Sequence, residues 1–285
     1  MPGHDDGTLA APAPDVDDAP PGDATRPPAR SDLVRVVAVA VAALAQIVGS
    51  PLGAALPGAR SVAEVSDTFA TVVTPAGYAF AIWGVIFALC LAYAVYQALP
   101  AQHGRQVHRR VGWPLAVAFG ANAVWEVVFP QEGVWLLVAN GLILVTVTAT
   151  ALALGRLQDP EPTGVDRVLP TVAASLLLGW VTIATVANVA ISGVHLGAPT
   201  GTALASGAGI VALVAAAAVV LDVSLRLRVA AGPFAAAAGW GVLAVALNEP
   251  PTPVRLAAWF ALAVIGVGVL AQVWRTRRLV RTVLA

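Results

Sequence analysis

Aromatic and amide side chains lie at helical spacing within one long apolar segment, residues 168–192. Trp180, Ala184 and Asn188 are spaced i, i+4 and i+8, so they share one face of a helix. An indole offers a flat apolar surface, and an amide both donates and accepts hydrogen bonds. Ala184 and Ala187 are small enough for a neighbouring helix or a ligand to approach closely. These residue types predict noncovalent binding of a flat apolar molecule.

Three other apolar segments carry residues of the same types. Phe80, Trp83 and Phe87 group on one side of a helix within residues 75–98. The segment 112–129 carries amide, indole and carboxyl groups, and the next segment begins with Trp135. The candidate ligand-binding residues are Tyr78, Phe80, Trp83, Phe87, Asn122, Trp125, Trp135, Trp180, Ala184, Ala187 and Asn188.

Each polar candidate also has a purely structural interpretation, which the sequence leaves open. Asn122 and Asn188 are of the type that hydrogen-bonds between membrane helices, and Trp135 is of the type that anchors a helix at the membrane interface. Glu126 is either a proton or polar site inside the bundle or a carboxylate solvated near the interface. We predict no catalytic residue, since no nucleophile or acid–base pair is evident, and no metal site, since His, Cys and carboxylate groups lack ligand spacing.

The composition shows what must position these residues. Of the 285 residues, 58% are hydrophobic and 11% are charged, against about 25% charged in soluble domains. A chain so poor in charge cannot cover a surface that faces water, so we expect an integral membrane protein. The net charge of zero gives no indication of nucleic-acid binding.

The fold class that we expect is all-α and polytopic, with eight transmembrane helices. Each apolar run is about as long as the roughly 17–25 residues that span a bilayer. The runs are residues 33–55, 75–98, 112–129, 133–155, 168–192, 203–225, 232–248 and 254–275.

The arginines predict the orientation of these helices. With eight spans, both termini lie on one side of the membrane, and 14 of the 16 basic residues fall on that same side. Only Arg60 and Arg255 fall on the other side. Basic residues concentrate in cytoplasmic loops, so we expect both termini to be cytoplasmic, in a bacterial inner membrane. Residues 1–31, rich in Pro, Asp and Gly, are predicted to be a disordered cytoplasmic tail.

The aromatic motifs resemble those of a known family. TPAGYAFAIWGVIF (residues 74–87), ANAVWEVVF (121–129) and GWVTIATVANVAI (179–191) are similar to the second-, third- and fifth-helix signatures of the TspO/MBR family. These are the tryptophan-rich sensory proteins related to the mitochondrial translocator protein. Tyr78 replaces a tryptophan of the family pattern, and Glu126 stands where the family usually has a small polar residue.

The resemblance implies a TspO-like bundle of five helices over residues 32–193, followed by a three-helix membrane extension over 194–285. It implies binding of a porphyrin, a haem-like tetrapyrrole or a sterol-like molecule in a pocket in the outer half of the membrane, with no required cofactor. The expected partners are membrane lipid, a hydrophobic small molecule and a second copy of the chain, unless residues 194–285 cover the dimer surface.

Besides a purely scaffolding role for the last three predicted helices, three functional classes remain open at this point. The first is a membrane receptor or sensor for the flat apolar ligand. The second is a small-solute transporter that uses Glu126 as its coupling carboxylate. The third is an enzyme that breaks down a porphyrin in light, which only the family resemblance implies.

Overall fold

The structure, a computed structural model, describes residues 27, 29–158, 162 and 164–283, and only the backbone of 275–283. Every secondary-structure element of its described part is a helix, and this part has no strand. The α-helices are α1 (Arg30–Ala55), α2 (Val62–Thr68), α3 (Ile82–Gln97), α4 (Gln106–Val128), α5 (Trp135–Arg156), α6 (Gly164–His195), α7 (Ala203–Arg226), α8 (Ala231–Leu247) and α9 (Thr252–Val283). Short 3₁₀ turns precede α3, as η2 (Gly77–Ala81), and follow α4, as η4 (Phe129–Gln131).

The expected all-α membrane fold is confirmed. In the described residues, seven helical segments are long and apolar enough to cross a bilayer, and α8 is a shorter apolar helix of 17 residues. In number and order they agree with the eight predicted runs. Most of the predicted tail, residues 1–26 and 28, lies outside the described residues. Arg30 and Ser31, which were predicted to end the tail, already belong to α1, so the tail ends earlier than residue 31.

One helix lies where the sequence analysis expected only a loop. α2 begins after Ser61, whose hydroxyl accepts a hydrogen bond from the backbone N–H of Glu64 (3.2 Å). The Glu64 carboxylate accepts one in return from the backbone N–H of Ser61 (2.7 Å), which completes a capping box. The hydrogen bond from the Ser61 backbone N–H lowers the pKa of the Glu64 carboxyl group, because it favours the charged form. The pattern Ser-x-x-Glu was the sequence signal for this helix.

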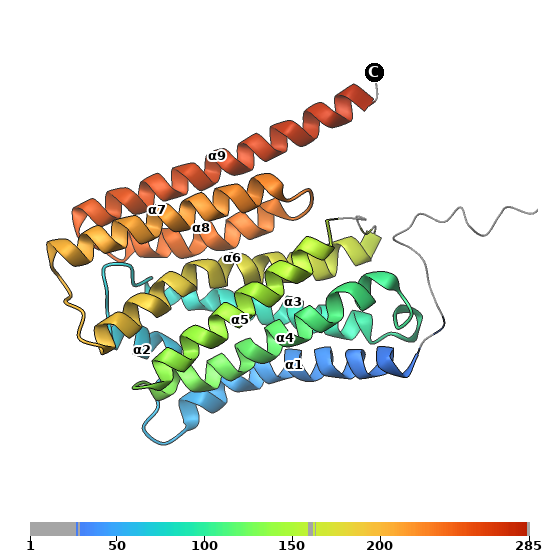
Figure 1. The fold of residues 1–285 in the computed structure, drawn as a ribbon, viewed down its shortest axis with the longest axis horizontal. Coiled ribbons are helices and arrows are strands. Elements are labelled where there is room, and N and C mark those ends of the chain that lie inside the picture. Colours follow the sequence, from blue (N-terminus) through green and yellow to red (C-terminus); the bar gives the residue numbers. More distant parts are fainter. Residues whose placement is uncertain (1–26, 28, 159–161, 163, 284–285) are drawn as a thin grey trace, which may run out of the picture.

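The helices form two groups that meet along α6 and α8. α1, α3, α4, α5 and α6 pack together, while α7 and α9 pack on each other and on α8 (Figure 1). Both described ends of the chain lie at the same end of the bundle. We call it the arginine-rich end, and we call the opposite end the α2 end.

The contact between the two groups depends on close approach of their backbones. Gly179 of α6 faces α8 so closely that a Cβ atom at this position would overlap with the carbonyl oxygen of Phe234. Small residues at such crossings let membrane helices pack through their backbones. This contact fixes α8 against the face of α6 that carries Trp180.

Candidate functional site

Three indoles from three helices form a cluster near the α2 end. Trp83 of α3 has its ring centroid 5.9 Å from that of Trp125 of α4 and 5.9 Å from that of Trp180 of α6. The planes of Trp83 and Trp180 are nearly perpendicular, at 84°. Edge-to-face pairs of this kind are favourable because the positive ring edge meets the negative ring face.

Phenylalanines extend the cluster on both sides. Phe80 of η2 meets Trp180 edge to face at 6.0 Å, and Phe129 of η4 stacks on Trp125 at 4.9 Å. All three indoles are buried, and Phe129 is buried with them. The result is a continuous aromatic wall built by α3, α4 and α6 with the two 3₁₀ turns.

A small cavity lies against this wall. Its volume is about 20 Å³, which admits about one water molecule. Small residues of α6, Ala184 and Ala187, border it beside Asn188. The cavity is lined by Val62, Ser66, Val73, Pro75, Phe80, Trp83, Trp125, Phe129, Trp180, Ile183, Ala184, Ala187, Asn188, Ile191, Gly241 and Val245.

The polar groups of the cavity are only partly paired. The indole N–H of Trp125 donates to the Asn188 side-chain oxygen (3.0 Å), and the Asn188 amide nitrogen donates to the Ala184 carbonyl (2.9 Å). The buried indole nitrogens of Trp83 and Trp180 have no hydrogen-bond partner among the described residues, and the buried Ser66 hydroxyl oxygen has none there either. Buried polar groups usually have partners, so three unpaired ones around a single cavity make this the candidate site.

Helix α8 completes the cavity, which the sequence analysis did not foresee. Gly241 and Val245 line it. The Trp240 indole donates to the Ala79 carbonyl (2.9 Å), and the Asn248 amide donates to the Thr74 carbonyl (3.1 Å). The backbone N–H of Ala76 also donates to the Ala244 carbonyl (3.1 Å). α8 therefore holds the segment that leads into α3, and the sequence signal for it was the indole of Trp240 on α8 together with the amide of Asn248, eight residues later at the C-cap.

The structure brings seven of the eleven predicted ligand-binding residues to this cavity. These are Phe80, Trp83, Trp125, Trp180, Ala184, Ala187 and Asn188. Their role in binding a ligand stays a prediction.

The other four predicted residues lie outside the cavity lining. Tyr78 is 48% exposed and packs its ring on Trp240 at 5.6 Å. Phe87 stacks behind Trp83 at 5.2 Å, and Asn122 donates to the Gln46 side-chain oxygen of α1 (3.1 Å). Trp135 is 48% exposed at the start of α5. The amide of Asn122 thus bonds across helices, one of the two interpretations that the sequence left open.

Glu126 lies on a different face of α4 from Trp125. It is fully buried, and its Cβ packs at the glycine contact with α1, where Gly49 and Gly53 bring the two helices together. Neither carboxylate oxygen makes a hydrogen bond of good geometry with a described residue, and the Ser50 side chain of α1 is its polar neighbour. Glu126 therefore belongs to the α1–α4 interface, and the solvated alternative does not apply in this structure. No group of three or more His, Cys, Asp or Glu residues in the described part of the chain is arranged to hold a metal ion.

Fold and site together define a polytopic helical membrane protein with a closed aromatic cavity near one end of its bundle. A family model described as TSPO-like protein matches residues 35–271, so the chain belongs to the TSPO-like protein family. No curated protein and no solved structure matches the chain. The matched range runs from α1 into α9, so it includes the three C-terminal helices as well as the five that carry the aromatic motifs.

Proposed function

We propose that this protein is a membrane receptor or sensor that binds a flat apolar ligand, a porphyrin-like tetrapyrrole or a sterol-like molecule, in the aromatic cavity. The observation that carries the proposal is the cluster of contacting indoles together with unpaired buried polar groups of Trp83, Trp180 and Ser66. The rings supply apolar surface, and the donors suit carbonyl, carboxylate or ring-nitrogen acceptors at the edge of such a ligand.

Ligand binding requires the cavity to widen, because about 20 Å³ is far below the roughly 300–1,000 Å³ of typical ligand sites. The short helix α2 closes the cavity through Val62 and Ser66. α2 lies outside the membrane helices; it packs on the bundle through Val62, Val65 and Ser66, and its other bonds, including that from Arg60 to Thr68, are exposed. Displacement of α2 is the opening step that we infer, since exposed polar bonds are exchanged with water at little cost.

The first test measures quenching of tryptophan fluorescence by protoporphyrin IX in the purified protein. We expect Trp180→Phe and Asn188→Ala each to raise the Kd about tenfold, which corresponds to roughly 1.4 kcal/mol. The first change removes an unpaired indole donor, and the second frees Trp125 from the bond that orients it.

Trp259→Phe is the matched control, since Trp259 lies half-exposed on α9, away from the cavity. Its Kd is expected to equal that of the unaltered protein. Unchanged affinity in both cavity variants would contradict the proposed site. Saturable binding of a sterol but not of protoporphyrin would keep the site and change the ligand class.

A second candidate function is a small-solute transporter, favoured by the buried and unpaired carboxyl group of Glu126. Buried ionisable groups in membrane helices commonly mark proton or ion pathways. Here we expect Glu126→Gln to abolish proton-dependent uptake into proteoliposomes while leaving protoporphyrin affinity unchanged, because Glu126 does not line the aromatic cavity. Uptake that survives the substitution, or that never depends on a proton gradient, eliminates this candidate. For either function, we propose a bacterial inner membrane with both termini in the cytoplasm; the arginine distribution supports this orientation.

A further inference from the structure

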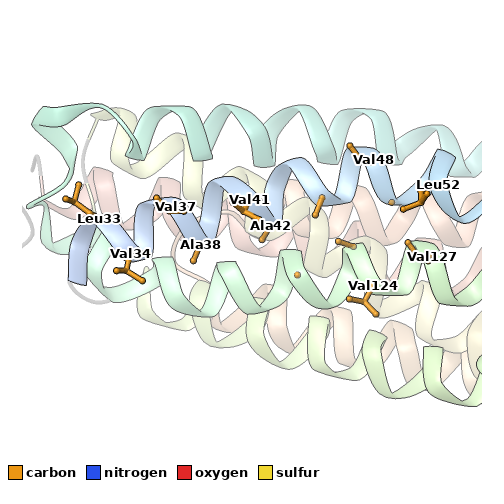
Figure 2. A pocket seen from close by; sticks show the side chains of 14 residues that line it. Leu33, Val34, Val37, Ala38, Val41, Ala42, Val48, Leu52, Val124 and Val127 are labelled. Carbon is orange, nitrogen blue, oxygen red and sulfur yellow. The ribbon is translucent and has the colours of Figure 1, made fainter. Parts of the chain in front are cut away.

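An open apolar groove runs along the outside of the bundle between α1 and α4. Its volume is about 890 Å³. The α1 residues span Leu33 to Leu52, about 28 Å at 1.5 Å per residue, which is close to the hydrocarbon thickness of a bilayer. Figure 2 shows the lining side chains in a row along the two neighbouring helices. Small residues, Ala38, Ala42 and Gly120, widen the middle of the groove.

A polar pocket adjoins the groove at the arginine-rich end. It has a volume of about 420 Å³ and is lined by Pro27, Ala29, Ser31, Asp32, Arg35, Arg109 and Trp113. The same two helices, with Pro27 and Ala29 just before α1, form both hollows, and Asp32 and Arg35 of the pocket flank the groove residues Leu33 and Val34 on α1. The apolar groove is therefore followed, along the same helices, by a pocket that contains two guanidinium groups.

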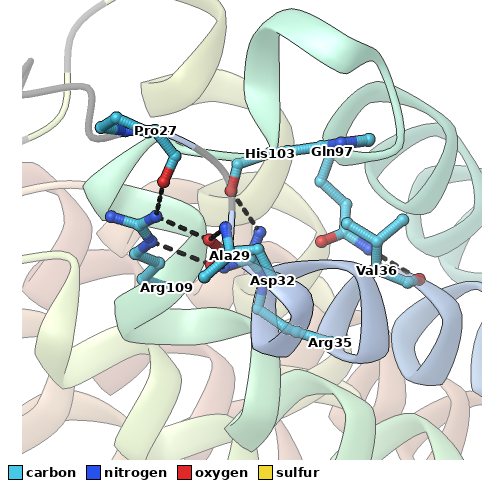
Figure 3. Close-up of polar contacts among 8 residues, drawn as sticks. All are labelled: Pro27, Ala29, Asp32, Arg35, Val36, Gln97, His103 and Arg109. Atoms are coloured by element: carbon cyan, nitrogen blue, oxygen red, sulfur yellow. Dashed lines mark hydrogen bonds and ion pairs between the residues drawn. The ribbon is translucent and has the colours of Figure 1, made fainter.

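Figure 3 shows how these charges are arranged. Arg35 donates to Asp32 (2.7 Å) and to the His103 carbonyl (2.9 Å), and its Nε has no partner among the described residues. Arg109 donates to both oxygens of Asp32, at 2.9 and 2.6 Å. A single carboxylate thus faces two guanidinium groups, so the pocket carries an excess of one positive charge. Arg109 is about one quarter exposed, and its side chain is accessible to a ligand.

We propose that the groove and the pocket together bind one anionic phospholipid, with an acyl chain along α1 and α4 and the phosphate beside Arg109. Nε and Nη2 of Arg109 already donate to Asp32 and to the Pro27 carbonyl, so Nη1 and the guanidinium charge are what Arg109 offers to a phosphate oxygen. The half-exposed indole of Trp113 lies at the same level and suits the headgroup region, where tryptophan is enriched. The excess positive charge favours an anionic lipid over a zwitterionic one.

A second copy of the chain is the competing occupant of this face. In a two-fold symmetric dimer each patch meets its own equivalent. A dimer through α1 and α4 would therefore bring two pockets of excess positive charge toward each other. This repulsion argues for a lipid, whose phosphate neutralises the charge.

The test is native mass spectrometry of the delipidated full-length protein titrated with phosphatidylglycerol or phosphatidylcholine. We expect one tightly held phosphatidylglycerol per chain, with an affinity about fivefold above that for phosphatidylcholine. This factor is the effect expected of one basic residue near an anionic headgroup. Arg109→Gln is expected to remove this preference. Gly120→Leu is expected to weaken retention of both lipids, because the leucine side chain would occupy the groove. The fold has room for it, since no described atom lies within 4 Å of a Cβ atom placed at Gly120.

Two matched controls separate the site from general effects. Arg228→Gln removes an exposed arginine from the loop between α7 and α8, and Gly141→Leu adds a side chain to an exposed position of α5 that is equally open. Both are expected to behave like the unaltered protein. Because Gly120→Leu does not touch the ion cluster, it tests the groove even if Arg109→Gln fails to fold.

Equal affinity for the two lipids in the unaltered protein would overturn the proposal. So would a preference that persists in Arg109→Gln, or lipid retention unaffected by Gly120→Leu. Disulfide formation between two chains carrying Val41→Cys, together with loss of the bound lipid, would instead assign the groove to a dimer.

Discussion

Asp32→Ala is expected to lower the free energy of unfolding by about 3–5 kcal/mol, the cost of leaving a buried charge without its partner. Arg35 is only 1% exposed, and Asp32 is the carboxylate that compensates its charge. The same carboxylate binds Arg109 and accepts a hydrogen bond from the backbone N–H of Ala29. The substitution therefore removes a charge partner from two arginines and a cap from the start of α1. Equilibrium unfolding in mixed detergent micelles measures the change.

The matched control is Asp222→Ala. Asp222 pairs with Arg226 one turn away on α7, but the two side chains are 57% and 76% exposed. An exposed pair at this spacing contributes about 0.3–0.5 kcal/mol. Similar losses in the two variants would show that Arg35 is solvated in the protein and that the ion cluster is not truly buried.

Gly179→Leu is expected to destabilise the protein by about 3 kcal/mol, at the upper end of the usual cost of overpacking a core. A side chain at this position must push the Phe234 carbonyl away, which separates α6 from α8. Since α8 contributes Gly241 and Val245 to the aromatic cavity, we also expect weaker protoporphyrin binding. Thermal unfolding followed by intrinsic fluorescence and the quenching titration measure the two effects.

Gly232→Leu serves as the control for this variant. Gly232 also lies on α8, but no described atom lies within 4 Å of a Cβ placed there. We expect its melting temperature to stay close to that of the unaltered protein. If Gly179→Leu is equally stable, the α6–α8 contact is looser than the structure shows. If it loses stability but keeps full ligand affinity, then α8 is not needed for the site.

The aromatic residues illustrate how far sequence reasoning extends. The i, i+4, i+8 spacing of Trp180, Ala184 and Asn188 predicted one shared face, and in the structure all three line the cavity. Helical periodicity was sufficient there because all three residues belong to one helix. Trp135 was predicted to bind the ligand too but lies half-exposed on α5, since its position at the start of a segment does not determine which way the helix is turned.

Glu126 shows that neighbours in the sequence can belong to different sites. It is adjacent in sequence to Trp125, and the two side chains belong to different contacts: Trp125 with Asn188 of α6, and Glu126 with the glycine face of α1. Neighbouring residues of a helix point about 100° apart, so adjacency in sequence does not imply a shared site. Only the position of α1 shows that Glu126 is enclosed.

The amino-acid sequence by itself determined the membrane class, the order of the eight apolar helices, the uneven distribution of arginines and the aromatic face of α6. These properties depend on composition and on periodicity within one segment. Tertiary structure decided that α8 completes the cavity, that Glu126 faces α1 and that α1 and α4 form both an apolar groove and the pocket that contains Arg109. The physical reason is that membrane helices have nearly uniform apolar surfaces, so small residues and close packing select their neighbours and rotations.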